Sequence, residues 1–468
     1  MKLKITLLFM LLLTVSGSYA QSPNDEAAAN FVKYSAEGNV EKVQLALSST
    51  SLDVNKQDAE KRTALLSAVS GKRIAIIKLL LAHPDIDVNR KIEITALWLA
   101  SYRGDAEVVK LLLAHADIDI NQAGSMFNGT ALAAASKQGK TEVVKLLLAH
   151  PNIDVNKANN RNNTALSMAS YSKKTEVVKL LLAHPDIDVN KITSEKYPTT
   201  ALLSASSLGQ SVIVKLLLTH PKIDINQAVG DDKYTPLLRA SSNGHSEVVK
   251  QLLAQPKLDI NKVDERKETA LDKAVYGKHI EVLKLLLADP DIDVNKVDMA
   301  GDTTLMWASY RNDTEVIKLL LSHPDIDVHK SSPINTAARN GNIEAVKLLL
   351  AYPKLDINNS VTGWTVLTAA AVHNQLPVIK LLLNKKEIDI NKSDRTGSSA
   401  LFYASHQGNT EVVKLLLAQP KIEIDTKNKE GNSALDIAYE KDHSEIIKLL
   451  KNAGAANNET ELDDIFDL

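Results

Sequence analysis

One apolar stretch recurs along the whole chain and limits what the chain can fold into more than any other feature. The fullest copy reads Glu176-Val-Val-Lys-Leu-Leu-Leu-Ala-His-Pro-Asp-Ile-Asp-Val-Asn190. The residue after the valine pair marks each of thirteen copies: Gln44, Lys78, Lys110, Lys145, Lys179, Lys215, Lys250, Lys284, Lys318, Lys347, Lys380, Lys414 and Lys448. Successive markers are 29 to 36 residues apart, most often 34. This period predicts a solenoid of stacked units rather than several separate globular domains.

The repeated stretch predicts a helix that cannot stand alone. In Glu176–Ala183 the two charged residues, Glu176 and Lys179, form one narrow stripe, and Val, Leu and Ala fill the rest. Such a helix has to be covered by a partner helix and by its equivalents in the adjacent repeats. Burying five of its side chains contributes on the order of 8–15 kcal/mol, whereas ordering the backbone costs about 1–2 kcal/mol per residue. One copy would therefore not fold, but a stack would.

Residues 1–20 predict a cleaved secretory signal peptide. Lys2 and Lys4 precede the apolar run Ile5–Val15, and Ser18 and Ala20 place small residues before a cut at Gln21. The alternative is an N-terminal membrane anchor, but the run is shorter than the ~20 residues that a span needs. We therefore expect export through the secretory pathway to a periplasmic or extracellular location, with no membrane insertion after cleavage.

The solenoid is expected over residues 21–454, with helices Phe31–Glu37 and Val40–Leu47 as its N-terminal cap. An inner repeat has a threonine N-cap such as Thr63, a short first helix, a turn that often carries glycine, and a long apolar second helix that stops at proline. Ser433–Asp442 and Ser444–Lys451 predict the C-terminal cap. The acidic residues 455–468 are expected to be a disordered tail.

The ninth repeat departs from the others in length. Only Lys330-Ser331-Ser332-Pro333 separates His329 from the next predicted helix, which accounts for the spacing of 29 before Lys347. We expect a shortened finger loop there and a seam in the array near residues 331–333.

These motifs resemble those of the ankyrin-repeat family across essentially the whole chain after the signal peptide. Thr235-Pro236-Leu237 keeps the family's helix start, most other repeats read Thr-Ala-Leu, and Asp188-Val189-Asn190 matches the family's closing triplet. The resemblance implies an all-α solenoid of stacked helix-turn-helix units with finger loops. The family's histidine after the leucine is missing here, and with it the side chain from which the family would draw hydrogen bonds between repeats.

Composition excludes several classes of function. The chain has 55 basic and 57 acidic residues, and loss of Lys2 and Lys4 with the signal peptide would leave a net charge of −4. No bulk charge attracts polyanions, so we expect no nucleic-acid binding. The absence of cysteine excludes disulfides, thiolate metal ligands and a cysteine nucleophile.

Two recurring polar patterns suggest metal sites but have simpler interpretations. Six histidines share one repeat position: His83, His115, His150, His184, His220 and His323. Parallel side chains about 8–10 Å apart do not converge on one zinc ion, and histidine is favoured at a helix C-terminus. Asp186-Ile-Asp188-Val-Asn190 resembles the start of a calcium loop, but Lys191 and Tyr197 stand where that loop needs glycine and glutamate. A turn that satisfies local backbone groups is the better interpretation.

The candidate binding residues are those that vary between copies at the exposed end of the first helix. In ankyrin-like stacks this end and the fingertips line a concave groove, and Trp364 is expected near a fingertip. Tyrosine, tryptophan and arginine are enriched in interface hot spots. The alternative is that the tyrosines only cap the helix against its neighbour. The candidates are Tyr102, Arg103, Tyr171, Tyr276, Tyr310, Arg311, Arg339, Trp364, His373 and His406.

The sequence therefore predicts a monomeric, non-enzymatic scaffold that is exported and binds a protein partner. No catalytic motif interrupts the repeats, so we expect no catalytic residue, no cofactor and no metal. Two alternatives remain open: a secreted effector that captures a host protein, and a stabiliser or inhibitor of a periplasmic enzyme.

Overall fold

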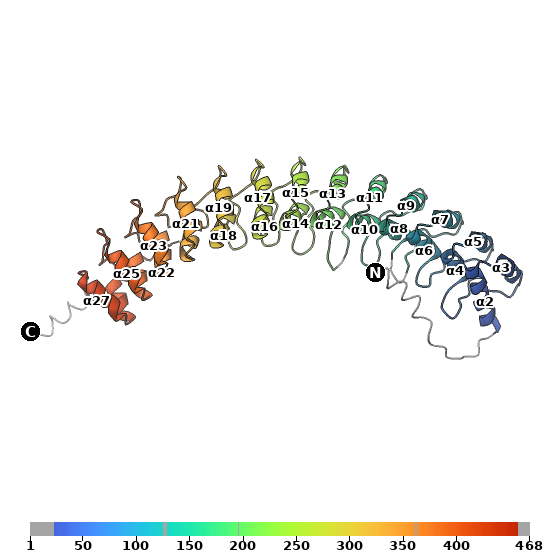
Figure 1. Ribbon diagram of the computed structural model, residues 1–468, viewed down its shortest axis with the longest axis horizontal. Helices are drawn as coiled ribbons and strands as arrows, with labels where there is room; N and C mark the ends of the chain where they lie inside the picture. Colours follow the sequence, from blue (N-terminus) through green and yellow to red (C-terminus); the bar gives the residue numbers. More distant parts are fainter. Residues whose placement is uncertain (1–22, 125–128, 195, 361–362, 457–468) are drawn as a thin grey trace, which may run out of the picture. The chain divides into compact units, whose positions relative to one another are not determined.

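The computed structural model describes residues 23–124, 129–194, 196–360 and 363–456 (Figure 1). These residues form 26 helices and no extended strand, which confirms the all-α prediction. The predicted signal peptide, residues 1–20, and most of the predicted tail, residues 457–468, lie outside the described residues.

The helices alternate between a first and a second helix of each repeat. The first helices are α2 Pro23–Glu37, α4 Ala64–Ser70, α6 Ala96–Arg103, α8 Ala131–Gln138, α10 Ala165–Tyr171, α12 Ala201–Ser207, α14 Pro236–Ser242, α16 Ala270–Tyr276, α18 Thr304–Tyr310, α20 Pro333–Arg339, α22 Val366–Val372, α24 Ala400–His406 and α26 Ala434–Glu440. The second helices are α3 Val40–Leu47, α5 Ile74–Leu81, α7 Ala106–Leu113, α9 Thr141–Leu148, α11 Thr175–Leu182, α13 Ser211–Leu218, α15 Ser246–Leu253, α17 Ile280–Leu287, α19 Thr314–Leu321, α21 Ile343–Leu350, α23 Leu376–Leu383, α25 Thr410–Leu417 and α27 Ser444–Asn452.

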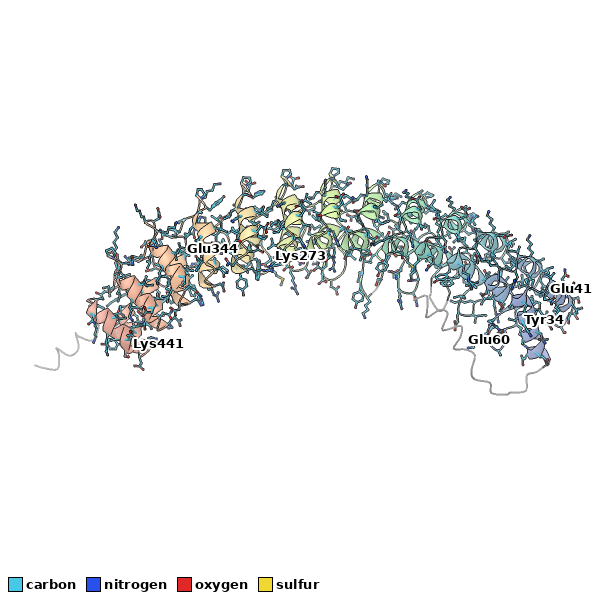
Figure 2. The ribbon with its side chains drawn as sticks, in the orientation of Figure 1. Tyr34, Glu41, Glu60, Lys273, Glu344 and Lys441 are labelled. Carbon is cyan, nitrogen blue, oxygen red and sulfur yellow. The ribbon has the colours of Figure 1, made fainter. Side chains whose placement is uncertain are left out.

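The chain divides into two compact units. The first comprises Met1–Ala240 with Ala254–Leu258, and the second comprises Ser241–Leu253 with Asp259–Leu468. Within each unit, first helices pack against first helices and second helices against second helices, as in the series α4, α6, α8 and α17, α19, α21. Two rows of helices therefore run through each unit (Figure 1). In the second unit, Lys273 lies on α16 in the first row and Glu344 on α21 in the second (Figure 2).

The second helices have the length that the sequence predicted. Helix α11 has eight residues, like the predicted Glu176–Ala183, but starts and ends one residue earlier, and it exceeds its partner α10 by one residue. Val177, Val178 and Leu181 are buried, while Leu180 and Leu182 are only half-buried. The helix ends at Leu182, three residues before Pro185. Helix α7 ends at the equivalent Leu113 although Ala116 replaces the proline, so the proline is not what ends the helix.

The N-terminal cap begins earlier than expected. Helix α2 starts at Pro23, not at Phe31. The added residues include Ala27–Ala29, which have the highest helix propensity, and Asp25 and Glu26 in the first turn, which favour the positive end of the helix dipole. The N-terminal cap therefore lies where it was predicted, but its first helix is longer than predicted.

Two local devices recur in the repeats. A Thr or Ser side chain accepts the backbone N–H three residues later and so caps the first helix, at Thr63, Thr95, Thr130, Thr164, Thr200, Thr235, Thr269, Thr303, Thr365, Ser399 and Ser433. The turn between the two helices needs a left-handed residue. Gly104 provides it with φ +87°, and in other repeats a residue such as Lys173 adopts it with φ +57°.

An asparagine ladder connects successive repeats. At each step the side-chain Nδ2 donates to a backbone carbonyl about thirty residues later, in the next finger. For Asn190 the acceptor is the Lys222 carbonyl at 2.6 Å, and the Asn190 Oδ1 accepts the Asp224 N–H at 2.9 Å. The asparagines are Asn55, Asn89, Asn121, Asn156, Asn190, Asn226, Asn261, Asn295, Asn358 and Asn391. The asparagine of the closing Asp-Val-Asn triplet therefore has a structural role, because it holds successive fingers together by hydrogen bonds.

The ninth finger is short and lacks both the side-chain cap and the ladder asparagine. The segment between α19 and α20 runs only from Ser322 to Ser332. Ser332 has φ +47° and makes no side-chain cap, and His329 stands where other repeats have the ladder asparagine. Helices α18 and α20 still pack together across this segment, as do α19 and α21. The seam near residues 331–333 stays a prediction.

None of the helices from α2 to α27, in the part of the chain that the structure describes, has the length and apolarity needed to cross a bilayer.

Candidate protein-binding face

The candidate residues lie at or directly after the C-terminal ends of the first helices, except Trp364, which precedes α22, and they differ in what they contact. Tyr171 ends α10 with 66% of its surface exposed, and Tyr310 ends α18 with 51% exposed. Arg339 ends α20 and is also exposed. His406 ends α24, where it is half-buried. These helix ends present side chains that a partner can reach.

Arg103 and Arg311 connect neighbouring repeats. The Arg103 guanidinium donates to the backbone oxygen of Ser70 and to its hydroxyl, at the end of the preceding first helix. Arg311 Nη1 donates to the Tyr276 carbonyl at 3.4 Å, the equivalent contact in the second unit. A cationic side chain is favoured at a helix C-terminus, so both arginines have a structural role in addition to any role in binding.

The first unit holds one aromatic stack. Tyr102 lies parallel to Trp98, one helical turn earlier on α6, with ring centroids 5.1 Å apart and an interplanar angle of 8°. Trp98 is buried, and Tyr102 remains half-exposed above it. The tyrosine therefore covers the tryptophan and keeps one accessible side.

The second unit holds a three-ring cluster made by two adjacent repeats. Tyr276 at the end of α16 meets the Trp307 ring of α18 edge to face, with centroids 5.9 Å apart. Tyr310 meets the same ring from its own helix, at 5.8 Å. We name Tyr276, Trp307 and Tyr310 the tyrosine–tryptophan cluster. Burial, followed by the nearby carboxylates of Asp272 and Glu268, raises the pKa of Tyr276, so its hydroxyl stays protonated.

A further group of rings surrounds Trp364. Trp364 lies directly before α22, and its ring faces His373 at 6.3 Å and Tyr403 at 5.8 Å. Burial, and then the charge of Arg339, lowers the pKa of His373. His373 is therefore a neutral partner for the tryptophan at neutral pH.

A finger-loop aspartate fixes a first-helix side chain in three repeats of the second unit. Each aspartate accepts hydrogen bonds from two backbone N–H groups of its own loop on Oδ1, and its Oδ2 accepts a hydrogen bond from the side chain nine positions later. Asp264 binds the Lys273 ammonium at 2.6 Å, Asp298 binds Trp307 Nε1 at 3.0 Å, and Asp394 binds the Tyr403 hydroxyl at 2.7 Å. The fingers thereby orient the residues that project from the middle of the first helices.

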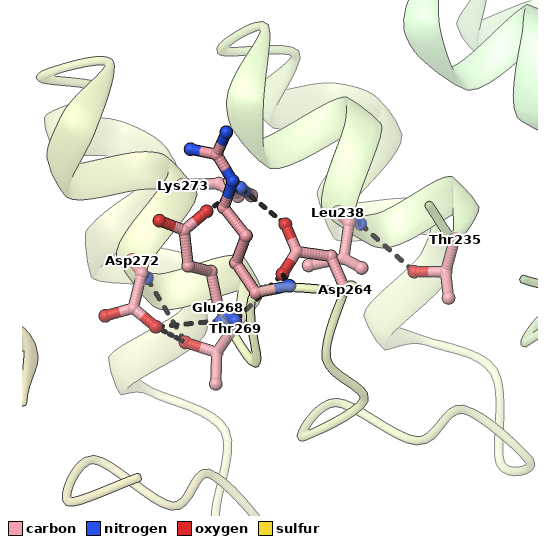
Figure 3. A network of polar contacts seen from close by, with 8 residues as sticks. Thr235, Leu238, Asp264, Glu268, Thr269, Asp272 and Lys273 are labelled. Atoms are coloured by element: carbon pink, nitrogen blue, oxygen red, sulfur yellow. Dashed lines mark hydrogen bonds and ion pairs between the residues drawn. The ribbon is translucent and has the colours of Figure 1, made fainter. Parts of the chain in front are cut away.

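The first of these loops closes around a cation. Figure 3 shows Lys273 between Asp264 and Glu268, with which it forms two ion pairs. Burial alone would lower the pKa of Lys273, but the bonds from both carboxylates outweigh it and raise the pKa. In the same view Asp272 accepts from the backbone N–H and hydroxyl of Thr269.

Residues in the slot of the missing family histidine do form bonds between repeats. Asp272 accepts a hydrogen bond from the Thr304 hydroxyl of the next repeat. In the same slot of α20, Asn335 Nδ2 donates to the Trp364 carbonyl at 2.7 Å. An acid or an amide can therefore connect adjacent first helices without the histidine.

The recurring histidines and aspartates serve the turns. His184 Nδ1 accepts the backbone N–H of Asp186 at 3.3 Å, and the other five histidines of the series make the same contact. Asp188 Oδ1 accepts the Asn190 N–H at 3.1 Å, as the turn interpretation predicts. Among the described residues, no group of three or more metal-ligating side chains is present.

Several residues that contribute to this face were not selected in the sequence analysis. Trp98, Trp307, Phe402 and Tyr403 lie inside the first helices and were not candidates, although they carry the ring contacts. A usable signal exists: an aspartate followed nine residues later by a hydrogen-bond donor, as at Asp264, Asp298 and Asp394. The contact depends on how the finger folds back, which the helical period does not report.

Comparison with known proteins identifies one type of repeat in the sequence. A family description of ankyrin repeats in three copies matches residues 26–123, 97–193, 159–229, 202–298, 305–394 and 388–461, and a second ankyrin-repeat description matches 279–321. Among solved structures, the chain is similar to the human ASB11 ankyrin repeat domain, with 28% identity, coverage of 48% of this chain and 100% of that chain, and a TM-score of 0.40. A search of curated proteins found no match.

Proposed function

Because the chain belongs to the ankyrin-repeat family, we propose that it is an exported, non-enzymatic scaffold that binds a protein partner. The scaffold comprises thirteen repeats between residues 21 and 454, follows a signal peptide at residues 1–20, and carries an acidic tail over residues 455–468. It acts as a monomer in the periplasm or outside the cell. The partner binds to the ends of the first helices and the adjoining finger loops.

The observation that supports this most is the exposure of aromatic side chains at one position of the first helix. Tyr171 and Tyr310 end equivalent helices in the two units and are 66% and 51% exposed. Large rings that stay accessible on a fixed helix end provide contact area at low entropic cost. The tyrosine–tryptophan cluster adds a fixed ring surface in the second unit.

Export and binding are tested separately. The full chain with a C-terminal tag should be recovered from the envelope or medium with Gln21 as its first residue. Recovery with Met1 intact inside the cell would contradict export.

Binding is tested by purifying partners with three versions of the tagged protein. The second version carries Tyr102, Tyr171, Tyr276 and Tyr310 changed to Ala. The third carries Leu45→Ala and Val212→Ala, two exposed apolar residues on second helices, 74% and 59% exposed, as a control for lost surface. A partner that is lost only with the tyrosine variant supports the face. A partner retained by that variant would make the tyrosines structural, and one lost with the control would place the site elsewhere.

A further inference from the structure

One finger loop of the second unit contains its own cation. In the loop that begins at Asp264, the Lys273 ammonium lies between the carboxylates of Asp264 and Glu268. The lysine side chain is only 9% exposed, and those of its two partners are 3% and 13% exposed. A buried charge needs a paired partner, and here each carboxylate has one.

The next loop has the same two carboxylates and no cation. Asp298 and Asp302 stand 34 residues after Asp264 and Glu268, and Trp307 stands 34 residues after Lys273. The indole supplies a neutral donor to Asp298. Within the described residues, neither Asp298 nor Asp302 forms an ion pair. Burial, and then the charge of Asp298, raises the pKa of Asp302, which is the expected response of a carboxylate pair that lacks a counter-charge.

Aromatic rings stand beside this pair of carboxylates. Trp307 takes the place of the lysine, and Tyr276 and Tyr310 meet its ring edge to face. Tyr310 is half-exposed, so solvent and a partner can reach the cluster. A ring face attracts an ammonium or guanidinium by about 0.5–2 kcal/mol, and a carboxylate strengthens the attraction. Arg311, whose guanidinium lies on the Tyr276 carbonyl, borders the cluster.

We infer that the surface formed by Asp298, Asp302, Tyr276, Trp307 and Tyr310 binds a lysine or arginine side chain from a basic segment of the partner protein. The incoming cation supplies to Asp298 and Asp302 the charge that Lys273 supplies one repeat earlier. This inference rests on the proposed binding function and specifies the chemistry of the partner.

The test measures binding of fluorescein-labelled peptides to the full chain by fluorescence anisotropy. The peptides alternate glycine with lysine, arginine or, as the neutral reference, glutamine. The lysine and arginine peptides should bind more tightly than the glutamine peptide. Asp302→Asn should weaken their binding about tenfold, equivalent to about 1.4 kcal/mol. Arg311→Gln should tighten it, because a competing cation is removed.

Trp307→Lys is the decisive variant. Its ammonium should pair with Asp298 and Asp302, as Lys273 pairs with Asp264 and Glu268, so that no site remains for a cation of the partner. The variant should fold, as the preceding repeat carries lysine at this place, and its melting curve checks this. Binding of the basic peptides should fall about tenfold or more. The control is Glu281→Gln with Glu315→Gln, which removes two negative charges from the second helices of the same repeats and should change binding less than about twofold.

The outcomes separate the two proposals. If Trp307→Lys and the control lose the same affinity for the basic peptides, the binding depends only on the overall charge, and the inference is wrong. Full binding by a folded Trp307→Lys protein would also overturn it. If no basic peptide binds, but the tyrosine variant still loses a purified partner, cation recognition is wrong and the scaffold function stands.

Discussion

Asn295 and Asp327 lie in successive fingers, and the Asn295 Oδ1 accepts the Asp327 backbone N–H at 2.8 Å. The same amide donates through Nδ2 to the Asp325 carbonyl at 2.6 Å. One side chain thus satisfies a donor and an acceptor of the following repeat. Because such pairs recur along each unit, the fingers are joined by hydrogen bonds and not by apolar packing alone.

Asn295→Ala should open the finger that follows it. The change leaves the Asp327 N–H and the Asp325 carbonyl without their side-chain partner, which costs about 0.5–1.5 kcal/mol locally because both bonds are exposed to solvent. Hydrogen exchange measured by mass spectrometry should become faster for the peptide that contains residues 322–332. Asn384→Ala changes an exposed asparagine at the end of α23 and should leave exchange there unchanged. Equal protection in both variants would make the ladder dispensable.

His329→Asn should stabilise the second unit. A single atom, His329 Nε2, lies 3.2 Å from the Lys354 carbonyl and 3.3 Å from the Asp356 N–H. One imidazole nitrogen cannot donate to the first and accept from the second at once, whereas an asparagine amide does both. The gained bond is worth about 0.5–1.5 kcal/mol. Thermal unfolding should shift upward for His329→Asn and downward for the reverse change, Asn358→His. A lower midpoint for His329→Asn would show that the short finger needs the imidazole.

The repeat itself was predictable, whereas the contacts between repeats were not. Helix α11 and its buried Val177, Val178 and Leu181 follow from apolar periodicity, because burial of one face is a local property of the sequence. The partner of Asn190 lies in another finger, more than thirty residues away. Lys273 reads as a solvent-facing helical residue until the preceding loop folds back and brings Asp264 to it. The candidate tyrosines were placed correctly on helix ends, but the ring that joins Tyr276 to Tyr310 lies inside α18.

The recurring histidine should be replaceable by an acceptor but not by an apolar residue. His184 Nδ1 accepts the Asp186 N–H, and in another repeat Asp289 Oδ1 accepts the equivalent N–H of Asp291 at 3.1 Å. His184→Leu should therefore lower the free energy of unfolding by about 0.5–1.5 kcal/mol, while His184→Asp should stay close to the original protein. Urea unfolding followed by circular dichroism measures both. Equal losses would assign the histidine's role to packing of its ring.

Asp272→Asn should remove a pH dependence of stability. Burial raises the pKa of Asp272 above its usual range, although bonds from Thr304 and Thr269 oppose the shift. Above the ordinary aspartate range, the folded protein holds a proton that the unfolded chain has lost, so the free energy of unfolding falls as pH rises. Asparagine carries no charge at any pH. The variant should match the original protein near pH ~3 and be more stable near pH ~7. Urea unfolding across this range measures the difference, with the exposed Asp232→Asn as the control. A loss of stability that is constant with pH would instead assign the role of Asp272 to its hydrogen bond with Thr304.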